Sequence, residues 1–268
     1  MLIKVNEQDE VITLGETCFK LRDKIKPNSD VIILNGFPLE ADKELLDGDR
    51  VVFIKKGQVP SAEELQGIMM ARHTPGVHEK VKIARVSIAG VGGLGSNIAI
   101  SLARLGVSYI KIVDFDVVEP SNLNRQQYFV KDIGEYKVKA LKRQLADINP
   151  FIEVEAIVKK IESHNVKELF QEVDIIIEAF DNPTYKAELC NTVLTTMKDK
   201  TVIASSGMAG FYSANDITTK KVTSKFYICG DGINEAKEGS GLMAPRVAIC
   251  ANHMANMALR IILGEEEI

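Results

Sequence analysis

The sequence predicts an α/β protein: a doubly wound, mainly parallel sheet preceded by a small α+β domain. From residue 81 onward, strand-like apolar runs alternate with helical patterns, which is typical of a parallel sheet with helices on both faces. A glycine-rich turn joins the first of these runs to the helix that follows it. The strand-like runs are 84–89, 109–113, 152–158, 173–179 and 201–205.

Residues 1–57 form the predicted N-terminal domain. Two strands, a helix stopped by Pro27 and two further strands match a β-grasp, or ubiquitin-like, plan. Asn35-Gly36 and Asp47-Gly48-Asp49 are turn sequences that separate its later strands. The expected strands are 2–5, 11–13, 31–34 and 51–54, and the expected helix is 16–25.

Residues 58–80 are predicted to be a helical linker. Ser61 is a suitable N-cap, and Glu63 and Glu64 place negative charge in the first turn of a helix that runs to about Met70. The sequence Arg-His-Thr-Pro-Gly at 72–76 should break that helix. Residues 81–268 then form the main domain, whose last helix is expected at 244–263.

The turn after the first strand of the main domain has the spacing of a nucleotide-binding motif. Gly90, Gly92 and Gly95 follow the G-x-G-x-x-G pattern, which permits a tight turn, close approach of phosphate and close packing of strand and helix. The next apolar run ends at Asp114, where an acidic residue can bind ribose hydroxyls. Together these features predict a nucleotide site.

Composition excludes several classes of protein. With 268 residues, a net charge of −4 and 46% hydrophobic residues, the chain is an ordinary globular protein with no basic surface for nucleic acid or membranes. No apolar run is long enough to span a bilayer, and the start lacks a signal-peptide core. The four cysteines are scattered, as expected for small buried residues. We expect a cytoplasmic location.

The segments after Asp114 carry a more specific signal. They read Ser-Asn-Leu-Asn-Arg-Gln-Gln at 121–127, Gly-Glu-Tyr-Lys at 134–137 and Ala-Phe-Asp-Asn at 179–182. Over residues 68–264 the chain resembles the ThiF/MoeB group of ubiquitin-activating-like adenylyltransferases, in its zinc-less ThiF subgroup. Residues 1–57 resemble ThiS, the sulfur carrier of thiamine synthesis, in the turn at 35–36 and in Leu-Asp-Gly-Asp-Arg-Val-Val-Phe at 46–53.

This resemblance implies a homodimeric enzyme that uses ATP and Mg²⁺. It would adenylylate the C-terminal glycine carboxylate of a small ubiquitin-like sulfur carrier, preferably that of thiamine synthesis, and release pyrophosphate. The resemblance implies that the turn under the nucleotide contains Gly90, Gly92, Gly93 and Gly95, and that Asp114 binds the ribose. It implies phosphate contacts for Asn122, Arg125 and Lys137, with Gln126 supporting the loop that carries Asn122 and Arg125. It also implies that Asp181 binds Mg²⁺ and that Arg72 inserts into a neighbouring subunit's site.

The expected chemistry calls for these residue types. Attack of a carboxylate on the α-phosphate of ATP brings anions together, and Arg, Lys and Mg²⁺ neutralise the charge that develops. No protein base is needed, because a carboxylate is ionised at neutral pH. Surface ion pairing is the alternative role for Lys137 and Arg72, and capping of the next helix is the alternative for Asp181.

The chain departs from the family pattern in two places. Many members bind zinc through two C-x-x-C pairs, whereas here only Cys229 lies near such a position, so we expect no zinc. Residues 234–240 contain no cysteine for sulfur transfer, and Cys190 is expected to pack in the core. The carrier-like part has no Gly-Gly end and runs on through 56–60, so it is not expected to be the activated carrier.

Two other functions remain open at this stage. An NAD(P)-dependent oxidoreductase would use the glycine turn and Asp114, but it leaves Arg125, Lys137 and Asp181 unexplained. A non-catalytic nucleotide-binding regulatory module would use the β-grasp domain as an interaction surface. The β-grasp domain itself has two possible roles, support of the dimer or competition with free carrier.

Overall fold

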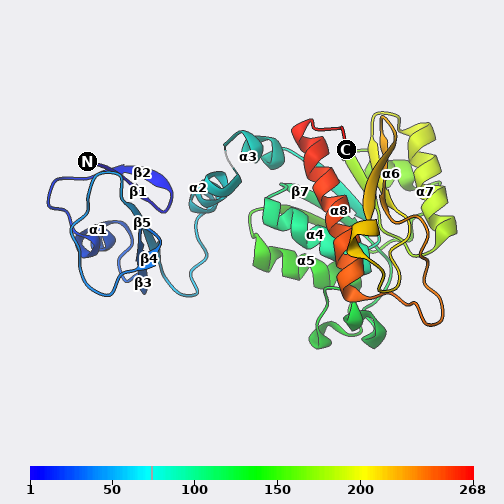
Figure 1. Cartoon of the computed structure of the whole chain (residues 1–268), viewed down its shortest axis with the longest axis horizontal. Helices are drawn as coiled ribbons and strands as arrows, with labels where there is room; N and C mark the ends of the chain where they lie inside the picture. The colour runs from blue at the N-terminus through cyan, green and yellow to red at the C-terminus, as the bar shows by residue number, and fades with distance from the viewer. Residues whose placement is uncertain (74) are drawn as a thin grey trace. The chain divides into compact units, whose positions relative to one another are not determined.

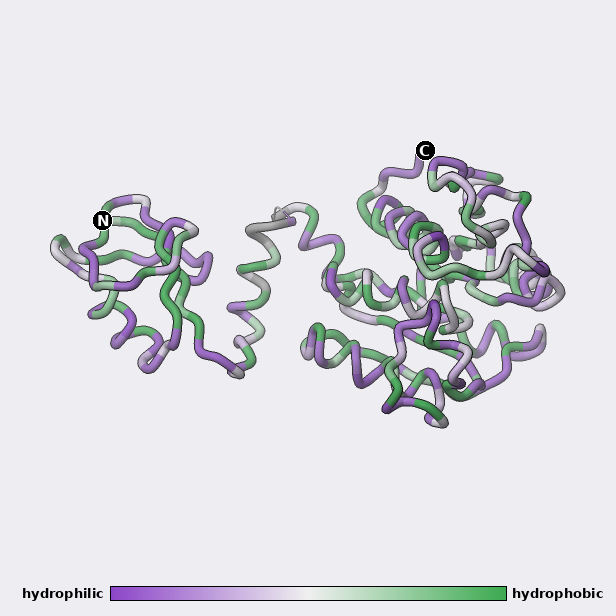
Figure 2. Tube along the Cα trace, turned by 60° about the horizontal axis from the view of Figure 1, so that its bottom comes forward, coloured by the Kyte–Doolittle hydropathy of each residue, from purple (hydrophilic) through white to green (hydrophobic). Residues whose placement is uncertain are grey.

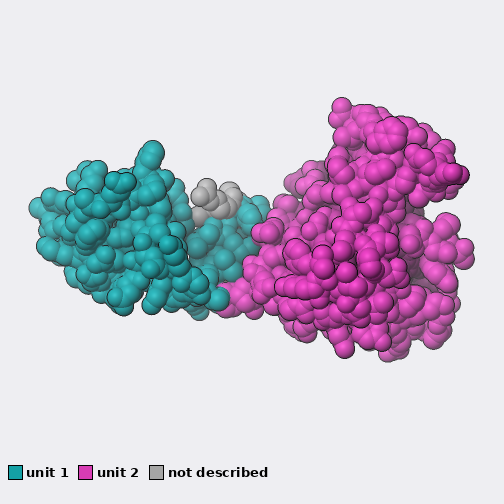
Figure 3. All heavy atoms as spheres, turned by 90° about the horizontal axis from the view of Figure 1, so that it is seen from below, with its two compact units in different colours: residues 1–78 teal, residues 79–268 magenta. Residues whose placement is uncertain are grey.

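The computed structural model describes residues 1–73 and 75–268, without the side chains of Gln66, Met70, Ala71, Arg72 and Pro75. The chain divides into two compact units, Met1–His78 and Glu79–Ile268, which are coloured separately in Figure 3. Within the described residues, no helix is both long enough and apolar enough to cross a membrane.

The first unit contains a β-grasp sheet, as predicted. Its strand order is β2-β1-β5-β3-β4, with β1 parallel to β5. The second strand begins and ends earlier than predicted, because Asn6 and Glu7, both with positive φ, form a tight turn directly after the first strand. The elements are β1 Leu2–Val5, β2 Gln8–Val11, α1 Cys18–Ile25, β3 Val31–Leu34, β4 Phe37–Pro38 and β5 Arg50–Ile54.

Alternation along the central strands builds the core of this unit. Every second residue of β1, β3 and β5 is buried, as expected for strands with one face on a core. These residues pack against Cys18 and Leu21 of α1. Thr17 accepts a hydrogen bond from the backbone N–H of Lys20 and so caps this helix.

Helix α2, Ala62–His73, continues beyond the predicted end and is followed by α3, Pro75–Lys82. Its first turn is bonded to the β-grasp part of the same unit. The Glu64 carboxylate lies 3.0 Å from Nζ of Lys26 and accepts a 3.1 Å hydrogen bond from Nδ2 of Asn6. The segment that follows β5 is therefore held against the β-grasp core.

The second unit contains a seven-stranded sheet of order β11-β12-β10-β9-β6-β7-β8. All neighbouring strands are parallel except the edge strand β11, which confirms the predicted fold class. The sequence analysis did not predict β11 and β12; β11 is a polar edge strand, Thr-Thr-Lys-Lys-Val-Thr, whereas β12 is apolar and mostly buried. The strands are β6 Arg85–Ala89, β7 Tyr109–Val113, β8 Glu153–Ile157, β9 Ile175–Glu178, β10 Thr201–Ser205, β11 Thr218–Thr223 and β12 Phe226–Gly230.

Helices cover both faces of this sheet (Figure 1). Helices α4, α5 and α8 form one layer, and α6 and α7 form the other, over an apolar core that includes Phe170, Ile176 and Val193. Figure 2 shows hydrophobic and hydrophilic stretches alternating along the trace. The helices are α4 Gly93–Leu105, α5 Lys137–Ile148, α6 Val166–Phe170, α7 Pro183–Thr196 and α8 Ala244–Leu263.

Candidate functional site

A cavity of about 390 Å³ opens at the carboxyl edge of the parallel strands. Residues that directly follow β6, β7, β9 and β10 contribute to its lining, together with residues a little further along the chain after β8 and β12. Strand β6 lies between β7 and β9, so the strand order runs outward from β6 in both directions, through β7 on one side and through β9 on the other. Such a switch point is where ligands bind in open α/β sheets.

The glycine turn forms the floor of the cavity. Gly90 has a φ of +88°, a conformation that favours glycine, and Gly90, Gly92 and Gly93 line the cavity. Gly95 has a different function, because a Cβ at this position would lie 1.9 Å from the carbonyl oxygen of Gly90. Gly95 therefore allows α4 to pack against the turn, and only the other three glycines face the cavity.

Asp114 lies in the cavity beside this turn. Its carboxylate accepts 2.8 Å hydrogen bonds from the backbone N–H groups of Val91 and Asp116. Burial raises the pKa of Asp114, while these donors and Lys137 oppose the shift. A carboxylate has about four acceptor positions, so the remaining ones are available to ribose hydroxyls.

Arg125 and Lys137 bring positive charge to the same cavity. The Lys137 side chain is only 8% exposed, and its Nζ lies 2.8 Å from a carboxylate oxygen of Asp116. Arg125 follows the short 3₁₀ helix Pro120–Asn124, where its Nη1 donates a 2.8 Å hydrogen bond to Oδ1 of Asn124. Lys137 thus makes an ion pair at the wall of the cavity, which is the alternative considered from the sequence, and its contact with phosphate stays a prediction.

Gln126 and Asn122 differ in their relation to the cavity. Gln126 lines it, is 8% exposed, and has a buried Oε1 without a hydrogen-bond partner among the described residues. Asn122 is not among the lining residues, and its side chain accepts a 3.1 Å hydrogen bond from the backbone N–H of Glu119. The predicted contact of Asn122 with phosphate stays a prediction.

Asp181 lines the cavity after β9 and is exposed. In the described part of the chain its side chain has no hydrogen bond or ion pair. The residue that caps α7 is Asn182, whose Oδ1 accepts from the backbone N–H of Thr184 at 2.8 Å, so capping does not explain Asp181. A free carboxylate is a suitable ligand for Mg²⁺. The described side chains include no group of three or more His, Cys, Asp and Glu that could hold a metal on their own.

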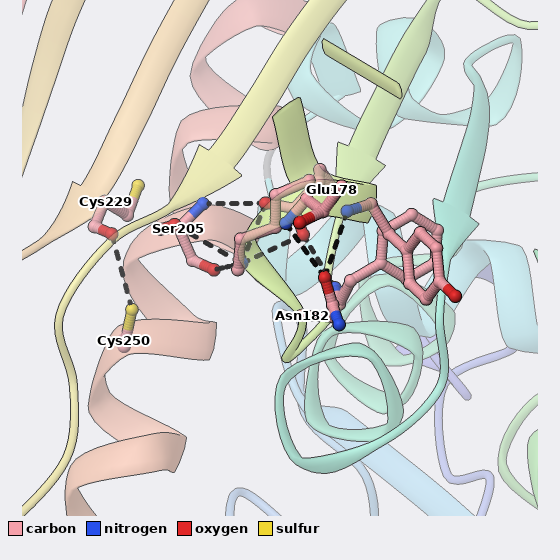
Figure 4. A network of polar contacts seen from close by, with 9 residues as sticks. Glu178, Asn182, Ser205, Cys229 and Cys250 are labelled. Atoms are coloured by element: carbon pink, nitrogen blue, oxygen red, sulfur yellow. Dashed lines mark hydrogen bonds and ion pairs between the residues drawn. The ribbon is translucent and has the colours of Figure 1, made fainter. Parts of the chain in front are cut away.

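A buried ionic network beside Asp181 was missed at the sequence level. Glu178 is completely buried, and Nζ of Lys186 lies 2.9 and 3.0 Å from its two carboxylate oxygens and 2.7 Å from Oγ of Ser205. Figure 4 shows Glu178, Ser205 and Asn182 close together at this edge. The sequence held one sign of this network: Glu178 directly follows the apolar run Ile-Ile-Ile at 175–177, where an acidic residue is unusual in a buried strand.

One part of the cavity lining, the small-residue wall, consists mainly of small or neutral residues and includes one acidic residue, Glu235. Residues 205–209 and 234–236 form it, with Leu242 and Val247. Lys186 also borders this half, but its three N–H donors already have acceptors in Glu178 and Ser205. Among its described residues this wall therefore offers no free cation to a phosphate group, and it carries one carboxylate, that of Glu235.

All four cysteines are free and buried, as predicted. Burial raises the pKa of the Cys190 thiol to about 12, which keeps it protonated at neutral pH. Figure 4 also shows Cys250 beside Cys229, whose carbonyl oxygen lies 3.7 Å from Sγ of Cys250. The side chain of Arg72 lies outside the described residues, so its predicted role stays a prediction.

Comparison with known proteins places this geometry in a family. The ThiF family model matches residues 66–268, and the ThiS-like ubiquitin family model matches residues 1–57. The adenylyltransferase and sulfurtransferase UBA4 of Eremothecium gossypii is 30% identical over 221 residues, which are 78% of this chain and 49% of that protein. The sulfur carrier protein ThiS adenylyltransferase of Bacillus subtilis is 29% identical over 198 residues, 72% of this chain and 58% of that protein. The chain thus spans about half the length of these curated relatives.

Solved structures agree with the fold. The tRNA N6-threonylcarbamoyladenosine dehydratase TcdA of E. coli, in complex with ATP, superposes with a TM-score of 0.69 at 20% identity over 78% of this chain and 98% of that chain. MccB of E. coli with ATP superposes with a TM-score of 0.56 at 25% identity over 76% of this chain and 63% of that chain. The family match, the fold and the cavity lead to one conclusion. The chain belongs to the ThiF family.

Proposed function

We propose that this protein is an ATP-dependent adenylyltransferase that activates the C-terminal glycine carboxylate of a small ubiquitin-like sulfur carrier and releases pyrophosphate. One observation carries the proposal: a single cavity holds the glycine turn, Asp114, the cations Arg125 and Lys137 among others, and a carboxylate without a partner in the described residues, Asp181. An NAD(P)-dependent oxidoreductase would need neither Arg125 and Lys137 nor Asp181 at this place. Family membership supports the same activity.

The described side chains suggest how the reaction proceeds. The acceptor carboxylate enters along the small-residue wall at 205–209 and forms a bond to the α-phosphorus of ATP, and the bond to the pyrophosphate oxygen breaks. Arg125 and Lys137 neutralise the charge that builds on the phosphates. Lys137 gives one donor to Asp116 and keeps two for phosphate oxygens. Asp114 holds the ribose.

The chain fits a bound Mg²⁺ that is shared with the nucleotide. Asp181 supplies a hard oxygen ligand in the cavity, and Mg²⁺ commonly completes its coordination with water and substrate phosphates. When bound, the ion neutralises negative charge on the phosphates. We also propose that the protein holds no structural zinc, since paired cysteines of the C-x-x-C type do not occur in its sequence.

We propose the carrier of thiamine synthesis as the preferred substrate. The ThiS-like match of residues 1–57 and the name of the Bacillus subtilis relative support this choice. We further propose a homodimer in which Arg72 completes the partner's site, and a cytoplasmic location, which the four free cysteines favour.

ATP–pyrophosphate exchange tests the proposal. The full chain is incubated with ATP, Mg²⁺ and labelled pyrophosphate, and with one purified carrier at a time: that of thiamine synthesis, that of molybdopterin synthesis, or a carrier shortened by its terminal glycine. Exchange with an intact carrier, and none with the shortened one, is expected. Exchange with the molybdopterin carrier and not with the thiamine carrier would identify the molybdopterin carrier as the substrate. Nucleotide binding without exchange would favour a regulatory module, and binding of NAD(P) in place of ATP would favour the oxidoreductase.

A further inference from the structure

An ion pair between Asp231 and Arg246 lies buried behind the small-residue wall of the cavity. The Asp231 side chain is 3% exposed and that of Arg246 is 4% exposed, so neither partner is a surface charge. Asp231 follows β12, and Arg246 lies in the first turn of α8. Neither residue is among those that line the cavity.

Each partner also binds the backbone of the wall. The Asp231 carboxylate accepts 2.8 Å hydrogen bonds from the N–H groups of Ile233 and Asn234 and a 2.7 Å bond from Nδ2 of Asn234. Arg246 donates from Nη2 to Asp231 and from Nη1 to the carbonyl oxygens of Tyr212 and Ser213. The pair thus connects the segments 206–213 and 231–236 with the start of α8.

The two wall segments also lie in direct backbone contact. The N–H of Asp231 donates to the carbonyl of Gly207 at 2.9 Å. A Cβ on Gly207 would lie 2.1 Å from Oδ1 of Asp231, and a Cβ on Gly230 would lie 1.8 Å from the carbonyl oxygen of Ser206. The two segments therefore pack too closely at Gly207 and Gly230 for any side chain larger than a hydrogen atom.

The segments that these contacts hold contribute to the lining of the cavity. Segments 206–209 and 234–236 line it, whereas the glycine turn, Asp114 and Lys137 belong to other elements and have no bond to the pair. Donors from Asn234, Ile233 and Arg246 outweigh burial and lower the pKa of Asp231 to about 2, so the pair stays ionised at neutral pH.

We propose that Asp231 and Arg246 are positioning residues that hold the wall along which the acceptor tail enters, without touching substrate. The proposal rests on the proposed function, because it assigns this wall to the acceptor. Loss of the pair should loosen the wall while the nucleotide half keeps its shape. The KM for the carrier should therefore rise, and the affinity for ATP should not change.

The test compares Arg246→Met and Asp231→Asn with a matched control, Lys111→Met. Lys111 is 5% exposed and paired with Glu155 at 3.2 Å, but it does not line the cavity. We expect the KM for the carrier to rise on the order of tenfold to a hundredfold in both pair variants, with ATP affinity by calorimetry within about twofold of the parent. Arg246→Lys should restore part of the loss, since it keeps the charge.

Equal loss of ATP and carrier affinity, or an unchanged KM, would overturn the proposal. Limited proteolysis gives a readout that does not depend on activity. In the pair variants the segments 206–213 and 231–243 should become the first cleavage sites, whereas Lys111→Met should retain the parent pattern. If the parent shows no exchange with any carrier, the proposed function fails, and with it the role of the pair toward an acceptor. If the parent does exchange, a parent-like cleavage pattern in the pair variants would reject the positioning role by itself.

Discussion

Asp114 comes after β7 and Asp181 after β9, and both line the same cavity, but their surroundings differ. Asp114 is half-buried and accepts two backbone hydrogen bonds, which hold its carboxylate in one orientation. Asp181 is exposed and has no bond within the described residues. A fixed carboxylate suits the recognition of a neutral hydroxyl pair, and a free one suits a metal ion that arrives with the nucleotide.

Replacement of Asp181 tests the metal role. Asp181→Ala should lower the rate of pyrophosphate exchange on the order of a hundredfold or more, because a charge-compensating group at the phosphates is lost. The circular dichroism spectrum should not change, since the side chain makes no contact that supports the fold. Asp147→Ala, an exposed carboxylate of α5, is the control and should exchange normally. Near-normal exchange by Asp181→Ala would reject the assignment.

Acid stability tests the strength of the buried pair. The pKa of Asp231 is lowered to about 2, below its unfolded value near 4, so its contribution to stability is complete above pH 4 and is lost as the pH falls through 2. The lowering of the pKa of Asp231 on folding corresponds to about 2 kcal/mol of unfolding free energy. The difference in unfolding free energy between the parent and Asp231→Asn, measured by urea titration, should shrink by this amount between pH 5 and pH 2. A difference that is independent of pH would contradict the assignment.

At the scale of secondary structure, the ends of strands and helices form the candidate site. The carboxyl-terminal side of the parallel strands borders the cavity, and α4 begins at the glycine turn, so that the N-terminus of a helix lies at the cavity, where an anion is favoured. The closest packing of this arrangement is at Gly95, where a Cβ would overlap the carbonyl oxygen of Gly90. The position of α4 relative to β6 therefore depends on the absence of a single side chain.

Gly95→Ala tests this packing. The added methyl group would force α4 away from the turn, so we expect a loss of about 1–3 kcal/mol of stability and weaker ATP binding. Gly67→Ala is the control, since its Cβ would have only ordinary contacts at 3.8 Å and alanine favours a helix. Thermal unfolding and ATP titration measure both effects. A Gly95→Ala protein with parent stability and affinity would show that the turn can relax.

On the scale of the molecule, a carrier-like unit precedes a domain that we propose to act on carriers. The unit does not end as a free carrier would, because the chain continues into α2, and Glu64 of α2 is bonded to Lys26 and Asn6 of the β-grasp part. A tethered unit has a high effective concentration. Permanent occupation of the carrier site would therefore leave little activity, and support of the dimer is the role we expect.

Deletion of residues 1–57 separates the two roles. Support of the dimer predicts weaker self-association, measured by analytical ultracentrifugation, together with lower exchange activity. Occupation of the carrier site predicts an intact dimer with a lower KM for free carrier. A truncated protein that matches the parent in both respects would exclude both roles.

Metal content is the second property of the whole molecule that can be measured. We expect less than stoichiometric zinc in the purified protein by elemental analysis, and a melting temperature that chelators do not change. All four cysteines are free and buried, and the sequence holds no pair with zinc-binding spacing. One tightly bound zinc per chain would contradict this expectation.

The predicted site and the observed one agree where the signal is local. Gly90, Asp114, Arg125, Lys137 and Asp181 all line one cavity, and each belongs to a short motif or follows a recognisable strand. Their chemical roles stay predictions. The pairs Glu178–Lys186 and Asp231–Arg246 were not predicted, because a charged residue in a sequence does not show which distant residue will neutralise it.

What the sequence determined by itself are the features that depend on periodicity and turn chemistry. The five strands β6 to β10, the glycine turn and the last helix, Ala244–Leu263, follow from these patterns. Only the tertiary structure shows that β6 lies between β7 and β9 and that the polar strand β11 is an edge strand of the sheet. Only the tertiary structure shows which buried charged residues form pairs. The physical reason is that periodicity and turns arise from interactions between near neighbours in the chain, whereas strand order and charge pairing depend on long-range packing.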